Sequence, residues 1–112
     1  MITPEQQAIC DRFGVIPAEA PPDLKLGITT DIASALPLNG LRHPPDRDIT
    51  GWYIWSGETF PDAADAFAPL HISHLATHCP AVIPYLALPP GYRFLVTPGQ
   101  EDIWYDPSLL IT

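Results

Sequence analysis

Basic residues are scarce in this chain: five lysines and arginines stand against thirteen aspartates and glutamates, and the net charge is −8. Nucleic-acid binding depends on a cationic surface, and anionic membrane surfaces also attract cationic segments. The composition therefore argues against a nucleic-acid or membrane partner. It favours a basic protein as the partner, because opposite charge steers association. Acidity that only maintains solubility is the alternative.

Long apolar runs are also absent, and none approaches the roughly 18–20 residues that a membrane-spanning helix needs. Residues 1–7 contain no basic segment followed by an apolar one, so they lack the pattern of a secretory leader. We therefore expect a cytoplasmic protein. The 112 residues, 46% of them hydrophobic, suit one folded domain over residues 1–112.

Cysteine is rare, with only Cys10 and Cys79 present. Neither belongs to a C-x-x-C pair, and both lie in segments with a helical pattern. A cytoplasmic protein keeps its thiols reduced, so we expect two buried thiols. A disulfide and a reactive thiol are the alternatives.

Catalytic motifs are missing as well. The chain has no G-x-S-x-G nucleophile turn, no H-E-x-x-H metal motif and no glycine-rich phosphate loop. We accordingly expect a protein that is not an enzyme and that carries no cofactor.

Proline, by contrast, is abundant, and the fifteen prolines divide the chain into short elements. Thr3, Pro4 and Gln6 predict a helix start, and Gly14 predicts its end. A proline-rich arm follows over 15–25, the pair 39–40 indicates a turn, and 60–67 reads as an irregular acidic connection. Strands are predicted at 26–32, 41–43, 52–55, 92–96 and 102–106, and helices at 69–79 and 80–86. This order predicts an α+β fold, with a small, mainly antiparallel sheet packed with an N-terminal helix and a central pair of short helices.

The segment 51–58 carries two of the three tryptophans between two glycines. On a strand, Trp52 lies on one face and Trp55 on the other, so both faces are apolar. We expect Trp52 and Trp104 to lie in the core. We expect Trp55 to be an exposed anchor, since tryptophan is common in binding hot spots.

Four short segments occur together in this chain: the Gly-Trp strand ending in Ser56-Gly57-Glu58, the Ile83-Pro84-Tyr85-Leu86 segment, the Pro90-Gly91 turn, and Arg42 with Pro44. Together they resemble the bacterial immunity-protein-33 family. The resemblance covers about residues 26–110 and leaves 1–25, the helix and the arm, outside an immunity-protein-like core at 26–112. It implies an inhibitor that binds and neutralises a cognate toxin of a polymorphic-toxin system.

Five residues are the predicted partner contacts: Arg42, Asp46, Asp48, Trp55 and Glu58. Each has a structural alternative. Arg42 would pair with Glu58 or Asp48, or stack on a tryptophan. Glu58 would cap a turn, and the aspartates would be solvated loop residues.

Three histidines, His71, His74 and His78, would lie along one edge of a predicted helix and are weak metal candidates. They support an alternative function, a small metal- or ligand-binding domain that uses His71, His74 and Glu58. A third possibility is self-association through the aromatic strand. The sequence leaves the oligomeric state open.

Overall fold

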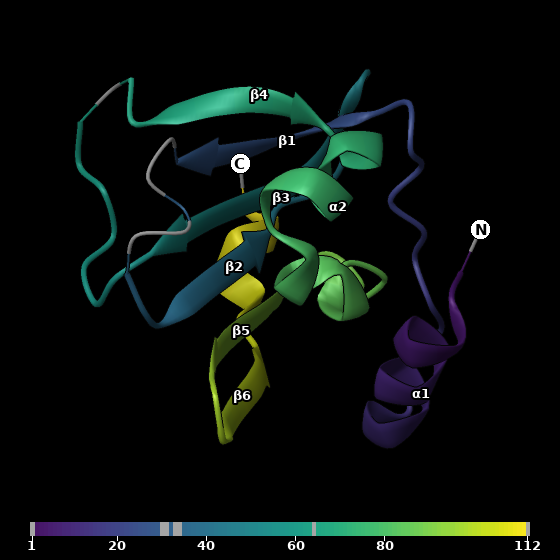
Figure 1. Cartoon of the computed structure of the whole chain (residues 1–112). Helices are drawn as coiled ribbons and strands as arrows, with labels where there is room; N and C mark the ends of the chain where they lie inside the picture. The colour runs from purple at the N-terminus through teal and green to yellow at the C-terminus, as the bar shows by residue number, and fades with distance from the viewer. Residues whose placement is uncertain (1, 30–31, 33–34, 64, 112) are drawn as a thin grey trace.

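A six-stranded sheet in the order β4-β1-β3-β2-β5-β6 forms the centre of the computed structural model, which describes residues 2–29, 32, 35–63 and 65–111 (Figure 1). Its strands are β1 (Lys25–Thr29), β2 (Leu38–Arg42), β3 (Ile49–Ser56), β4 (Phe67–His71), β5 (Tyr92–Thr97) and β6 (Gln100–Tyr105). Strands β1 and β3 run parallel, and the other neighbouring pairs are antiparallel.

The helical elements are short. They comprise α1 (Pro4–Phe13), α2 (Leu75–His78) and three 3-10 segments, η1 (Ile72–His74), η2 (Pro80–Tyr85) and η3 (Pro107–Leu110). In Figure 1, α2 and the green turns after it lie in front of the sheet, whereas the yellow C-terminal turn η3 lies behind it. The predicted α+β class is confirmed, as are the N-terminal helix and the short central helices.

Helix α1 begins and ends where the local signals predict. Thr3 and Gln6 form a reciprocal capping box, Pro4 occupies the first turn, and Gly14 adopts the left-handed conformation at φ 67°. Such caps satisfy backbone groups that a helix end leaves unpaired. Gln6 also donates to the Ile83 carbonyl at 2.8 Å, which joins α1 to η2.

The main core lies between the sheet and these helices. Trp52, Ile54 and Phe94 point toward them from the central strands and meet buried residues of α1, α2 and η2. The Trp52 indole donates to the Leu86 carbonyl at 3.0 Å, so its one polar atom is satisfied. The prediction that Trp52 is a core residue is confirmed.

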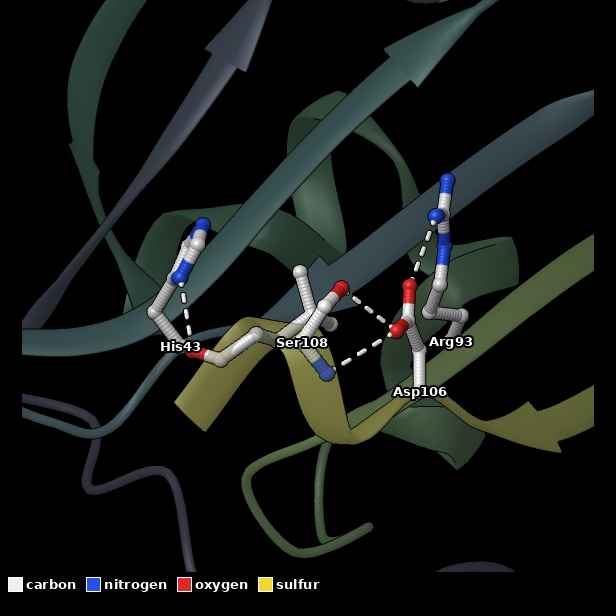
Figure 2. Close-up of polar contacts among 5 residues, drawn as sticks. His43, Arg93, Asp106 and Ser108 are labelled. Carbon is white, nitrogen blue, oxygen red and sulfur yellow. Dashed lines mark hydrogen bonds and ion pairs between the residues drawn. The ribbon is translucent and has the colours of Figure 1, made fainter. Parts of the chain in front are cut away.

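The opposite face of the sheet holds a smaller cluster of Leu41, Trp55 and Leu109, with Tyr53 and Phe67 against it. Segment η3 is fastened over this face, as Figure 2 shows. Asp106 accepts hydrogen bonds from the Ser108 amide and hydroxyl and forms an ion pair with Arg93 at 3.2 Å. His43 Nδ1 lies 3.1 Å from the Leu109 carbonyl oxygen. The C-terminal segment therefore covers part of the second face.

Two predicted elements were wrong. Asn39 and Gly40 lie inside β2 rather than in a turn, because a Cβ at Gly40 would stand 2.2 Å from the Phe94 ring and only glycine allows that approach. Residues 69–71, predicted as the start of the 69–79 helix, lie in strand β4 instead, because β4 pairs along the whole length of β1. The helical pattern holds only from Ile72 onward.

Both cysteines are free and buried, as predicted. Burial raises the pKa of the Cys10 and Cys79 thiols, so both favour the uncharged form. The Cys10 thiol lies 3.5 Å from the Ala87 carbonyl oxygen, to which it donates.

An ion pair connects α1 to the β5–β6 hairpin, and the tyrosine beside it predicts how stability depends on pH. Tyr85 donates to Glu101 at 2.6 Å, and Glu101 also pairs with Arg12. Burial and this carboxylate raise the pKa of Tyr85 to about 12, while the tyrosine hydroxyl lowers the pKa of Glu101.

Replacing Tyr85 by phenylalanine should therefore raise the pKa of Glu101, which a carbon-detected NMR titration measures. Because the folded pKa of Tyr85 lies above the ordinary value, its stabilisation is present below about pH 10 and is lost as the pH rises through the folded value. The stability difference between parent and variant should shrink over that range. An unchanged Glu101 pKa in the variant would contradict the contact.

Candidate functional site

Arg42, a predicted partner contact, lies inside the protein with only 2% of its surface exposed. Its guanidinium points toward the helix side and stands 5.6 Å from the Trp52 ring, so the predicted stacking on a tryptophan is present. It donates at 2.7–3.3 Å to five backbone carbonyls, those of Ala18, Glu19, Thr50, Leu86 and Leu88.

No ion pair joins Arg42 to Glu58 or Asp48 within the described residues, and Asp48 pairs with Lys25 instead, at 3.2 Å. Burial without a carboxylate lowers the pKa of Arg42 to about 10. A partner could reach this guanidinium only after the 15–25 arm moved away. We therefore leave Arg42 out of the surface proposed below.

The predicted exposure of Trp55 and the predicted burial of Trp104 were both wrong. Trp55 is 4% exposed, because Phe60 from the following loop packs edge-on against its ring with centroids 4.9 Å apart. Trp104 was expected in the core but is 41% exposed, because it lies on the edge strand β6, where its ring stacks on Arg93. Trp55 is therefore not an exposed anchor, and other aromatic residues are exposed instead.

The predicted acidic contacts do not form one patch. Asp46 and Asp48 precede β3, and Glu58 follows it; all three are exposed. The eight residues of β3 separate them by roughly 26 Å at about 3.3 Å per residue. A single small interface cannot use both groups at its centre.

The histidines are likewise separated from Glu58. His71 pairs with Lys25 at the Ile49 end of the sheet, whereas Glu58 lies beyond the opposite end of β3. The rings of His71 and His74 touch, with centroids 5.6 Å apart. Within the described residues, no group of three or more histidine, cysteine or acidic side chains could hold a metal ion. The alternative site of His71, His74 and Glu58 is therefore not assembled, and His78 instead lines an apolar depression beside Ile32 and Ala81.

A different feature stands out at the Glu58 end of the sheet. Phe60 is 51% exposed, yet its ring packs against Trp55, and its centroid lies 5.7 Å from that of the Phe67 ring. Glu58 and Asp62 flank it in the chain and are exposed. We call Glu58, Phe60 and Asp62 the Phe60 surface.

A depression of about 480 Å³ adjoins Phe60 and is lined by Thr59, Asp62 and Thr29, among others. The Thr29 hydroxyl lines it, is buried, and has no hydrogen-bond partner among the described residues. This region was predicted only as an irregular acidic connection. The available signal was a phenylalanine between carboxylates in a proline-containing loop.

The charges of this surface are uncompensated. Arg12, Lys25 and Arg93 each pair with a carboxylate elsewhere, and Arg42 is buried on carbonyls. The fifth basic residue, Arg47, is exposed but precedes β3, at the opposite end of that strand from Glu58. No ion pair reaches Glu58 or Asp62 within the part of the chain that the structure describes. A rigidly seated aromatic ring among free carboxylates is suited to contact a basic surface.

These observations define a small acidic α+β domain with an exposed aromatic ring flanked by carboxylates. The chain belongs to the Imm33-like domain family, whose model matches residues 5–106. That match includes α1 and the 15–25 arm, so the expectation that residues 1–25 lie outside the family was wrong for all but the first four. No curated protein and no solved structure matches the chain significantly. Among the described residues, no helix has the length and apolar character to cross a membrane.

Proposed function

We propose that this protein is a non-enzymatic immunity-type protein that binds a cognate bacterial toxin domain in the cytoplasm and neutralises it. The observation that carries the proposal is the Phe60 surface, an exposed ring held by buried Trp55 and flanked by Glu58 and Asp62, which form no ion pair among the described residues. Membership of an immunity-protein family supports a protein partner.

Inhibition would require no bond breaking. The net charge of −8 would steer the protein toward a basic toxin domain, and Phe60 would then bury its exposed face against it. Carboxylates around the ring would pair with cations that the toxin uses to hold its own substrate, and so would block access. Asp46 and Asp48 stay predicted contacts for a partner broad enough to reach the other end of β3.

The first experiment co-expresses the protein with toxin domains encoded near its gene. We expect one of them to co-purify in a stoichiometric complex and its toxicity to be suppressed. A protein that neither rescues growth nor forms a complex with any of these domains would contradict the proposed function.

The second experiment locates the surface by measuring affinity with calorimetry and association rate with stopped-flow kinetics on that complex. Phe60→Ala should weaken binding by about thirtyfold, the range of an aromatic hot spot. Asp62→Lys should mainly slow association and reduce its salt dependence. Ile111→Ala is the matched control, because Ile111 is 80% exposed and lies elsewhere.

Thermal unfolding of each variant separates a binding loss from a folding loss. If Phe60→Ala binds as tightly as the parent while Asp46→Lys and Asp48→Lys do not, the Phe60 surface is the wrong site although the function stands.

A further inference from the structure

Strand β6 forms one margin of the sheet, and its outer edge carries no further strand (Figure 1). Within the described residues, no backbone hydrogen bond reaches that edge from a loop or helix. Such an edge is a template for another extended chain, unless something blocks it.

The direction of the free backbone groups follows from the hairpin register. Thr97 pairs with Gln100 across a two-residue turn, and the Asp106 amide donates to the Gly91 carbonyl at 2.7 Å. Because hydrogen bonding alternates along an antiparallel pair, the even-numbered residues of β6 bond to β5. The amides and carbonyls of Glu101, Ile103 and Tyr105 therefore point outward.

The two edge strands of the sheet, β4 and β6, differ in how readily they could pair with a further strand. Strand β4 contains Pro69, which has no amide to donate, and proline is a common block on an edge. Strand β6 contains no proline over its six residues. It instead presents two exposed aromatic rings on opposite faces, Trp104 at 41% and Tyr105 at 50%.

An apolar depression of about 600 Å³ adjoins the Tyr105 end of this edge. Ile16, Pro89 and Tyr92 line it together with Tyr105. In strand addition, main-chain hydrogen bonds provide affinity and side pockets select alternate side chains. The depression could accept an apolar side chain of an added strand.

We propose that the outer edge of β6 receives an extended segment of the basic protein partner as a further strand of the sheet. This proposal rests on the proposed function and adds a docking mode to it. Charge decides between occupants: Asp102 has no cation partner in the described residues, and a second copy would bring its own net charge of −8 to the same edge.

A synthetic six-residue peptide that alternates lysine with valine tests the edge without a toxin. Titrated into the full-length protein and followed by NMR, it should shift the amides of Glu101, Ile103 and Tyr105 and slow their hydrogen exchange. The same peptide N-methylated on the residues facing β6 should not bind. Equal binding of the N-methylated peptide, equal binding of a glutamate–valine peptide, or no binding at millimolar concentration would overturn the proposal.

A matched pair of variants tests the backbone contact itself. Tyr105→Ala and Tyr105→Pro both remove the ring, but only proline removes the outward amide. Loss of one backbone hydrogen bond should weaken the lysine peptide about five- to tenfold in the proline variant relative to the alanine variant. Equal affinities in two variants with matched thermal stability would contradict strand addition.

The same spectra identify the competing occupant. Concentration-dependent shifts of these three amides without any peptide would mean that a second copy occupies the edge, which overturns the choice of partner. A toxin complex that forms without protecting these amides would disprove strand addition and leave the proposed function intact.

Discussion

Replacing Arg42 by methionine is expected to lower the free energy of unfolding by about 3–5 kcal/mol. The guanidinium holds together carbonyls from three separate segments: the proline-rich arm, the start of β3, and the stretch around Leu86 and Leu88. Methionine fills a similar volume but donates nothing, so these carbonyls lose their partner. A buried carbonyl without one costs about 1–3 kcal/mol.

The free energy of unfolding of Arg42→Lys should lie between that of the parent protein and that of Arg42→Met. Lysine keeps the charge but has three donors at one point, whereas arginine spreads five donors over a planar fork. It can therefore satisfy fewer of the carbonyls. The measurement is urea unfolding followed by circular dichroism.

The control for Arg42 is Arg12→Met. Arg12 is exposed and makes an ion pair with Glu101, so its loss should change stability by at most about 1 kcal/mol. If Arg42→Met proves as stable as the parent, the arm is held by its other contacts and the role assigned to this guanidinium is wrong. Those contacts include a hydrogen bond from the Ala18 amide to the Ala87 carbonyl at 2.7 Å.

Replacing Gly51 by alanine is expected to destabilise the protein by more than about 3 kcal/mol. Gly51 has a φ of 93°, and a Cβ there would lie 1.9 Å from the His43 carbonyl oxygen. The His43 amide donates to the Gly51 carbonyl at 2.9 Å, so the two backbones cannot separate without breaking that bond. Backbone strain and a steric clash therefore both destabilise the Gly51→Ala variant.

Gly57 provides a matched control for this substitution. Its φ is 96°, nearly the same, but an added Cβ would meet nothing within 4 Å. Gly57→Ala should therefore cost only the backbone strain, of order 1–3 kcal/mol. The additional destabilisation of Gly51→Ala over Gly57→Ala measures the steric clash with the His43 carbonyl. Equal losses of stability in the two variants would show that a backbone shift relieves this clash.

These positions connect stability to the site. Gly51 lies where the register of β1 against β3 shifts, between the pairs Lys25–Ile49 and Gly27–Tyr53. The strand after this shift carries Trp55, on which Phe60 rests. A variant that disturbs the start of β3 is therefore expected to loosen the Phe60 surface as well as the core.

Features that depend on neighbours along the chain could be predicted from the amino-acid sequence. Helix α1 has its cap, its proline and its terminal glycine within a few residues, and each acts locally. The positions of the central β3 strand and of the β5–β6 hairpin followed from apolar alternation and turn residues in the same way. The acidity and the scarcity of free cations were also readable directly.

Which of these residues face solvent could not be predicted from local sequence, because exposure depends on how the strands and loops pack. Trp55 and Trp104 have similar local sequences, but one lies under a loop in a central strand and the other lies on an edge strand. Arg42 lies buried because five carbonyls from distant segments accept hydrogen bonds from its guanidinium. Strand β4 formed because β1 offered an edge to pair with, although residues 69–71 were predicted as the start of a helix. Burial and pairing of this kind depend on partners far along the chain, and for that reason local patterns could not reveal them.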